Sequence, residues 1–112
     1  MIKKDQVYLE YILEAITKIE SFTKGISRFD FDRNVLIQDA IIRNIEIIGE
    51  ASKKIPVDFK LKWNLINWKN MAGMRDRLIH DYMGINYSIV WDVIKNKIPE
   101  LYIQITEVLE KE

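Results

Sequence analysis

The residues best suited to chemistry lie together in one short stretch, from Met74 to Tyr82. This stretch holds the only histidine of the chain, His80, with Arg75 five residues before it and Tyr82 two residues after it. Histidine titrates near neutral pH and can give or take a proton during catalysis. Arginine binds phosphate through two parallel N–H donors and stabilises charge that develops in a transition state. One hypothesis for this combination is metal-free cleavage of RNA, in which the neighbouring 2′-hydroxyl attacks the phosphate.

Helix geometry separates the arginine from the histidine. On a regular helix, Arg75 and His80 point about 140° apart and lie about 7.5 Å apart along the axis. Arg75 falls within an apolar stripe, where a charged group needs a carboxylate, a phosphate or a second subunit as its partner. His80 faces the polar side with Asp76. Either the helix loosens before His80, or the site combines residues of two copies of the chain. The apolar stripe consists of Trp68, Met71, Ala72, Leu78, Ile79 and Tyr82.

Taken one at a time, these residues also have purely structural interpretations. A single histidine near a helix end usually makes a local hydrogen bond there. Tyr82 would be a core aromatic residue, and Arg75 would pair with Glu50 or Asp76.

Hydrophobic residues recur every three or four positions along most of the chain, which predicts helices. The predicted helices span about 4–22, 33–54 and 68–82, followed by one that begins after Asn86, is kinked or divided at Pro99 and ends near Leu109. Their predicted N-caps are Asp32, Asn67 and Asn86, and their predicted stops are Gly25, Pro56 and Gly84. A short helical turn is expected around Phe59 and Leu61, and no segment resembles a strand. We therefore expect residues 1–112 to form a single all-α domain, an up-and-down bundle of four to five helices.

The predicted helix over 33–54 is apolar around more than half of its circumference. Such a helix must be covered on more than one side, by other helices or by a second subunit. Its polar stripe has the spacing of a surface ion-pair ladder. In a functional interpretation, Arg43 or Glu50 orients the motif of a neighbouring helix. The polar stripe consists of Asp39, Arg43, Glu46, Glu50 and Lys54.

Two glycines and two phenylalanines lead to further expectations. Gly49 and Gly73 lie inside predicted helices, where glycine costs about 1 kcal/mol relative to alanine. We therefore expect two helices to approach closely at both glycines, so that leucine at either position lowers the melting temperature sharply. Phe29 and Phe31 are expected to tuck into the core from a short turn.

The composition limits the functions that the chain can have. It has 112 residues, no net charge, no cysteine and one histidine, so neither a disulfide framework nor a histidine-rich metal site is predicted, and no cofactor is expected. No apolar run approaches the length of a membrane span, and a cytoplasmic protein is expected. Seven basic residues against two acidic ones lie between Lys53 and Arg77. This basic segment is interpreted as solvated helix faces, with a phosphate-binding surface as the alternative.

The pattern Arg-x4-His-x-Tyr, preceded by Gly73-Met74, resembles the active motif of the HepT family within the HEPN group of small helical proteins. The segment from Arg43 to Ala51, which contains Gly49-Glu50-Ala51, looks like a second signature of that family, and the pattern from Asn86 to Trp91 is the one expected after the motif. The resemblance covers nearly the whole chain in the right order.

The resemblance implies a function and a set of partners. HepT-like proteins are homodimeric toxins of toxin–antitoxin pairs and metal-independent ribonucleases. Their antitoxin is a nucleotidyltransferase of the MNT type, which neutralises the toxin by transferring AMP to the motif tyrosine. Carried over to this chain, Arg75 and His80 match the catalytic pair, Asp76 matches the polar residue after the arginine, and Tyr82 matches the AMP acceptor.

Two other functions remain open from the sequence. The chain could be a catalytically silent helical partner that binds nucleotide or docks a nucleotidyltransferase. It could also be a plain dimerisation domain.

Overall fold

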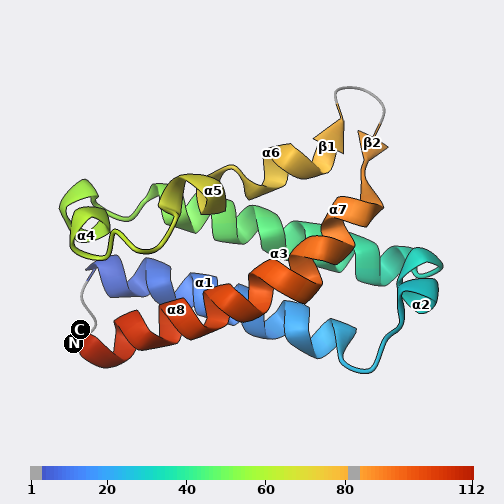
Figure 1. Cartoon of the computed structure of the whole chain (residues 1–112), viewed down its shortest axis with the longest axis horizontal. Helices are drawn as coiled ribbons and strands as arrows, with labels where there is room; N and C mark the ends of the chain where they lie inside the picture. The colour runs from blue at the N-terminus through green and yellow to red at the C-terminus, as the bar shows by residue number, and fades with distance from the viewer. Residues whose placement is uncertain (1–3, 81–83) are drawn as a thin grey trace.

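Three long helical rods form the body of the molecule. A computed structural model describes residues 4–80 and 84–112. In Figure 1, the rod formed by α7, η1 and α8 crosses in front of α1 and α3, whereas α5 and α6 lie along α3. The predicted all-α bundle is confirmed. The rods comprise α1 (Lys4–Thr23), α3 (Val35–Lys53) and the chain of α7 (Tyr87–Asp92), the π-turn η1 (Val93–Lys97) and α8 (Ile98–Lys111).

The shorter elements connect these rods, and two of them, α5 and α6, lie along α3. They are α2 (Arg28–Asp32), α4 (Val57–Lys62), α5 (Trp68–Ala72), α6 (Met74–Leu78) and the two-residue strands β1 (Ile79–His80) and β2 (Gly84–Ile85). Within the part of the chain that the structure describes, no helix is both long enough and apolar enough to cross a membrane.

The helix α2 replaces the short turn expected near Phe29 and Phe31. A capping box starts it, because the Ser27 hydroxyl accepts from the Asp30 backbone N–H at 3.1 Å and the Asp30 carboxylate accepts from the Ser27 N–H at 3.4 Å. Residues two apart on a helix point about 200° apart, so only one of the two rings can face inward. Phe31 is fully buried, whereas Phe29 is 62% exposed, and the prediction that both enter the core was wrong.

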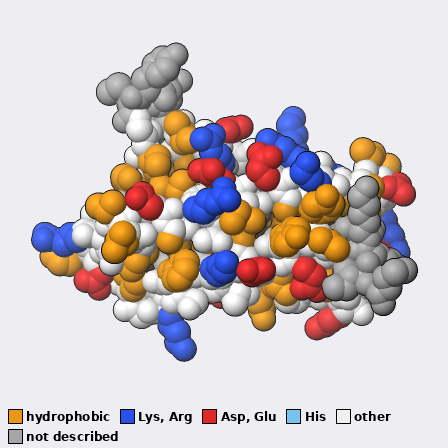
Figure 2. All heavy atoms as spheres, turned by 180° about the vertical axis from the view of Figure 1, so that it is seen from behind, with side chains coloured by type: hydrophobic (Ala, Val, Ile, Leu, Met, Phe, Trp, Pro, Cys, Tyr) orange, Lys and Arg blue, Asp and Glu red, His pale blue; other side chains and the backbone are white. Residues whose placement is uncertain are grey.

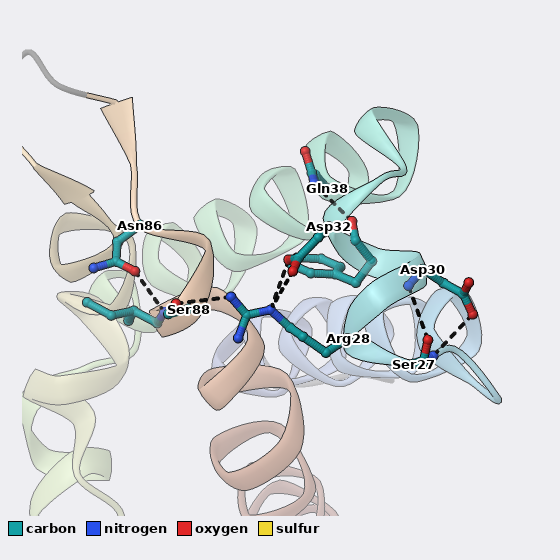
Figure 3. A network of polar contacts seen from close by, with 9 residues as sticks. Ser27, Arg28, Asp30, Asp32, Gln38, Asn86 and Ser88 are labelled. Atoms are coloured by element: carbon teal, nitrogen blue, oxygen red, sulfur yellow. Dashed lines mark hydrogen bonds and ion pairs between the residues drawn. The ribbon is translucent and has the colours of Figure 1, made fainter.

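The N-cap of α3 is Asn34 rather than the predicted Asp32. The Asn34 side-chain oxygen accepts from the Ile37 backbone N–H at 3.0 Å. Asp32 instead pairs with Arg28, whose Nε lies 2.9 Å from the carboxylate. Figure 3 shows that Arg28 also reaches Ser88 of α7, to which its guanidinium donates at 3.0 Å. These contacts fasten α2 to the last rod.

Replacing Asn34 with alanine is expected to lower the free energy of unfolding by about 0.5–2 kcal/mol, because the first turn of α3 loses its cap. Asp32→Ala removes only an exposed ion pair and is expected to lower it by less than about 1 kcal/mol. Urea unfolding of both variants compares the two losses. A larger loss for Asp32→Ala would contradict this assignment of the cap.

The first two rods bury most, but not all, of their predicted apolar faces. Leu9 of α1 is fully buried, whereas Tyr11 and Phe22 of the same helix are exposed. The helix α3 is covered by α1 on one side and by α5 and α6 on another, as its wide apolar arc predicted. Val35 and Leu36, in its first turn, remain exposed.

The close helix crossing predicted at two glycines occurs at one of them. A Cβ on Gly49 would lie 3.1 Å from the carbonyl oxygen of Ala72, at the crossing of α3 and α5. A Cβ on Gly73 would meet only the carbonyl oxygen of Lys69, at 3.5 Å and within its own segment. The prediction for Gly73 was therefore wrong, because this residue lies at the junction between α5 and α6 rather than inside a helix.

The last rod continues through Pro99 without a break. Proline in a helix lacks an N–H and clashes with the carbonyl four residues earlier. Pro99 lies in the first turn of α8, directly after the π-turn η1. The wider π-turn makes room for the proline ring, at the position where a kink or a new helix was expected.

Candidate active site

The predicted motif helix ends well before Tyr82. Its first part, α5, is capped by Asn67 as predicted, and α6 then stops at Leu78. The chain continues into β1, which pairs antiparallel with β2 so that His80 lies opposite Gly84. The sequence reading of a single helix over 68–82 was wrong, and so was the expectation of no strand.

Contacts outside the motif explain where α6 ends. The backbone N–H of Asn86 donates to the carbonyl of Leu78 at 2.8 Å, which joins the end of α6 to the start of α7. Gly84, which was expected to stop the helix, lies in β2. Its φ of +93° is positive, and glycine adopts such a backbone angle more readily than other residues. The helix therefore ends before His80, which is one of the two arrangements expected for the site. Tyr82 lies outside the described residues.

Arg75 is on the surface rather than in the apolar stripe. Its side chain is 47% exposed, whereas Met74 beside it is buried. The inward positions of this segment are Met71, Met74 and Leu78, at spacings of three and four, so that Arg75 falls just outside them. The prediction of a buried arginine was wrong, and its guanidinium is accessible to a ligand.

Two carboxylates hold the Arg75 side chain. Its Nε lies 3.5 Å from Oε1 of Glu46 on α3, and its Nη1 lies 3.7 Å from Oδ1 of Asp76. The pairing with Asp76 was predicted, but the partner on α3 is Glu46 instead of Glu50. Glu46 belongs to the same polar stripe as Glu50 and lies one turn earlier on α3. The way in which α6 crosses α3 places Arg75 beside Glu46, which the sequence alone does not show.

A pocket of about 350 Å³ lies around these charges, between α3 and the α5–α6 segment. Lys53 and Glu50 line it together and form an ion pair at 3.4 Å. Among the side chains that the structure describes, those of residues 6–79 and 84–112, no three His, Asp or Glu groups gather closely enough to hold a metal ion. The pocket is lined by Glu46, Gly49, Glu50, Lys53, Ala72, Arg75 and Asp76.

The other predicted supporting residue, Arg43, faces a different hollow. It lines a groove between α3 and α1 together with Tyr8 and Tyr11, and it is not among the residues around the Arg75 pocket. Figure 2 shows that, on the face seen from behind, Lys and Arg side chains alternate with Asp and Glu. The basic residues therefore do not form an uninterrupted patch on this face.

Comparison with known families extends these observations. A model of the family described as Ribonuclease HepT-like matches residues 12–108, which include Arg75, His80 and Tyr82. The chain belongs to the HepT-like ribonuclease family. The resemblance inferred from the motif is confirmed.

Several proteins of other organisms are similar to this chain over most of its length. A protein of Caldanaerobacter subterraneus, provisionally named as an RNase, is 46% identical over 98% of both chains. A protein of Methanocaldococcus jannaschii, also provisionally named as an RNase, is 43% identical over 98% of this chain and 92% of its own length. A protein of Thermococcus cleftensis named probable ribonuclease HepT is 51% identical over 84% of this chain and 86% of its own. No solved structure matches the chain significantly.

Proposed function

We propose that this chain is a ribonuclease that acts as the toxin of a toxin–antitoxin pair. Membership of the HepT-like ribonuclease family and the RNase names of several relatives support the activity. The observation that carries the proposal is the exposed Arg75 in a charged pocket, five residues before the histidine whose backbone leaves α6 for β1. We further propose that residues 1–112 act as one domain.

The proposed reaction needs no metal ion. The 2′-hydroxyl loses its proton to a base and attacks the adjacent phosphorus, while the 5′-oxygen of the next nucleotide takes a proton and leaves. The products are a 2′,3′-cyclic phosphate and a 5′-hydroxyl. His80 carries a proton in this scheme, and Arg75 binds the phosphate and stabilises its developing charge. Asp76 and Glu46 keep the guanidinium in place, and Glu50 supports the pocket.

The base and the acid require two proton-carrying groups, and each chain has one histidine. We propose that a homodimer supplies both, with His80 of each subunit at a shared cleft. The helix face around Val35 and Leu36 is apolar and exposed, so the monomer leaves apolar surface for contact with a partner.

Mixed dimers test this arrangement. Dimers of one wild-type and one His80→Ala subunit, isolated with two different affinity tags, are expected to lose nearly all cleavage, because a shared site would lack its acid or its base. If each subunit had its own complete site, the mixed dimer would keep about half of the wild-type rate, since symmetry gives two equal sites. A monomer in sedimentation at micromolar concentration would also contradict the proposal.

We also propose that an MNT-type nucleotidyltransferase neutralises the toxin by modifying Tyr82. The tyrosine oxygen would attack the α-phosphorus of ATP, forming a phosphodiester with AMP and releasing pyrophosphate. Mass spectrometry after incubation with such an enzyme and ATP is expected to show the added AMP on wild-type protein and none on Tyr82→Phe. Modification of both proteins would place the acceptor elsewhere.

A further inference from the structure

A second hollow lies beside the candidate active site, between α1 and α3. Its volume is about 270 Å³. Glu50 lines this groove and also the pocket that contains Arg75, so the two hollows meet at one side chain. The groove is lined mainly by Tyr8 and Tyr11 of α1 and by Arg43, Ile47, Glu50 and Lys54 of α3.

The two tyrosines offer an aromatic surface to a ligand. Their ring centroids are 6.3 Å apart and their planes are tilted by 59°, so the rings are not stacked face to face on each other. Tyr8 is half-buried and packs against the core, whereas Tyr11 is 51% exposed. Ile47 adds an apolar wall. An exposed aromatic ring beside an apolar wall suits a nucleobase, because every base has a face that can stack.

Two cations in the groove have no partner within the described part of the chain. Neither the guanidinium of Arg43 nor the ammonium of Lys54 forms an ion pair or hydrogen bond with a described residue, whereas the Lys53 side chain pairs with Glu50. The two positions are 11 residues apart on α3, on the order of 16 Å along the axis. They therefore lie at opposite ends of the groove, where they can reach phosphates on either side of a bound base.

We propose that this groove binds one unpaired base of an RNA strand, stacked on Tyr11, with the flanking phosphates at Arg43 and Lys54. The inference rests on the proposed ribonuclease function and adds the class of substrate: single-stranded RNA. Glu50, shared by both hollows, places the bound nucleotide next to the phosphate at Arg75. Bases in a duplex are stacked on their neighbours and cannot enter such a groove. Because stacking tolerates any base, the groove selects unpaired strands rather than a sequence.

A strand that cannot be cleaved separates binding from catalysis. Fluorescence anisotropy would measure the Kd of the full chain for a labelled single-stranded RNA in which every 2′-hydroxyl is methylated. Tyr11→Leu is expected to weaken binding about tenfold, and Tyr11→Phe to bind within about twofold of wild type, because phenylalanine keeps the ring. Tyr102→Leu is the matched control, since Tyr102 is an exposed tyrosine on α8 that does not line this groove.

The salt dependence of binding tests the two cations of the groove. Arg43→Gln and Lys54→Gln are each expected to reduce the slope of log K against log salt concentration by about 0.7, the contribution of one phosphate of a single strand. Lys24→Gln, an exposed lysine outside the groove, should leave the slope unchanged.

Several results would overturn this inference. One is a Tyr11→Leu variant that binds the methylated RNA with the Kd of wild type. Another is an equal rise in Kd in Tyr11→Phe and Tyr11→Leu. A third is a change in the sedimentation of Tyr11→Leu, which would indicate that Tyr11 contacts a second subunit. If wild-type protein cleaves RNA while Tyr11→Leu keeps its Kd, the proposal for the groove is wrong and the proposed ribonuclease function is retained. If no RNA is cleaved but the methylated strand binds through Tyr11, the proposal for the groove is retained and the proposed ribonuclease function is wrong.

Discussion

Replacing Arg75 with alanine is expected to lower RNA cleavage by about 10²–10³-fold, the usual effect of removing one group that stabilises transition-state charge. The melting temperature is expected to stay close to that of wild type. Its side chain is exposed, and its ion pairs with Glu46 and Asp76 are longer than ideal hydrogen bonds, so they contribute little to stability. Initial rates on a labelled RNA and a thermal melt measure both quantities.

The neighbouring Arg77 provides a matched control. It is also exposed and belongs to the same helix, but its guanidinium donates to the backbone carbonyl of Asn70 at 2.9 Å and does not line the Arg75 pocket. Arg77→Ala changes the net charge in the same way and is expected to retain cleavage within a few-fold. Arg75→Lys should fall between wild type and alanine, because lysine keeps the charge but loses the bidentate fork. Equal losses in the Arg75 and Arg77 alanine variants would mean that charge alone matters.

The second large effect is on folding. Gly49→Leu is expected to lower the free energy of unfolding by about 3 kcal/mol, at the upper end of what overpacking usually costs. The Cβ would sit 3.1 Å from the Ala72 carbonyl, a backbone atom that can move only if α5 moves away from α3. Gly73→Leu is expected to change stability by less than about 1 kcal/mol, because its Cβ meets nothing closer than 3.5 Å and its φ is negative.

Urea unfolding of the two leucine variants tests this difference. Similar losses at both positions would contradict the single close crossing at Gly49. The adjacent contact of α3 with α6 places Glu46 beside Arg75, so Gly49→Leu should also reduce cleavage in the fraction that remains folded.

Most helices could be predicted from the sequence because their signals are local. Asn67 and Asn86 cap the helices that they were expected to cap, and Gly25, after α1, has the positive φ expected of a helix stop. The helix near Phe29 and Phe31 was mistaken for a short turn because aromatic and polar residues alternate there. The Ser27–Asp30 capping box was the available sign of a helix.

The candidate site depended on contacts that the sequence does not display. No proline or glycine lies between Met74 and Tyr82, so nothing local indicated that α6 would end at Leu78. That end depends on the pairing of β1 with β2 and on the hydrogen bond from Asn86 to Leu78, both made by residues later in the chain. The exposure of Arg75 likewise depends on which residues of α5 and α6 meet α3, and its pairing with Glu46 depends on how the helices cross. The residue types of the motif indicated a possible reaction from the sequence alone. The contacts and exposure of these residues could be found only from the fold.

The most direct test of the proposed function is RNA cleavage in excess EDTA by wild-type protein and by His80→Ala, with analysis of the product ends. We expect wild-type protein to release fragments that end in 2′,3′-cyclic phosphates, and His80→Ala to release none above background. No cleavage of several single-stranded RNAs by unmodified, dimeric wild-type protein would contradict the ribonuclease and favour a partner that docks a nucleotidyltransferase. Undiminished cleavage by His80→Ala would contradict the role given to the histidine.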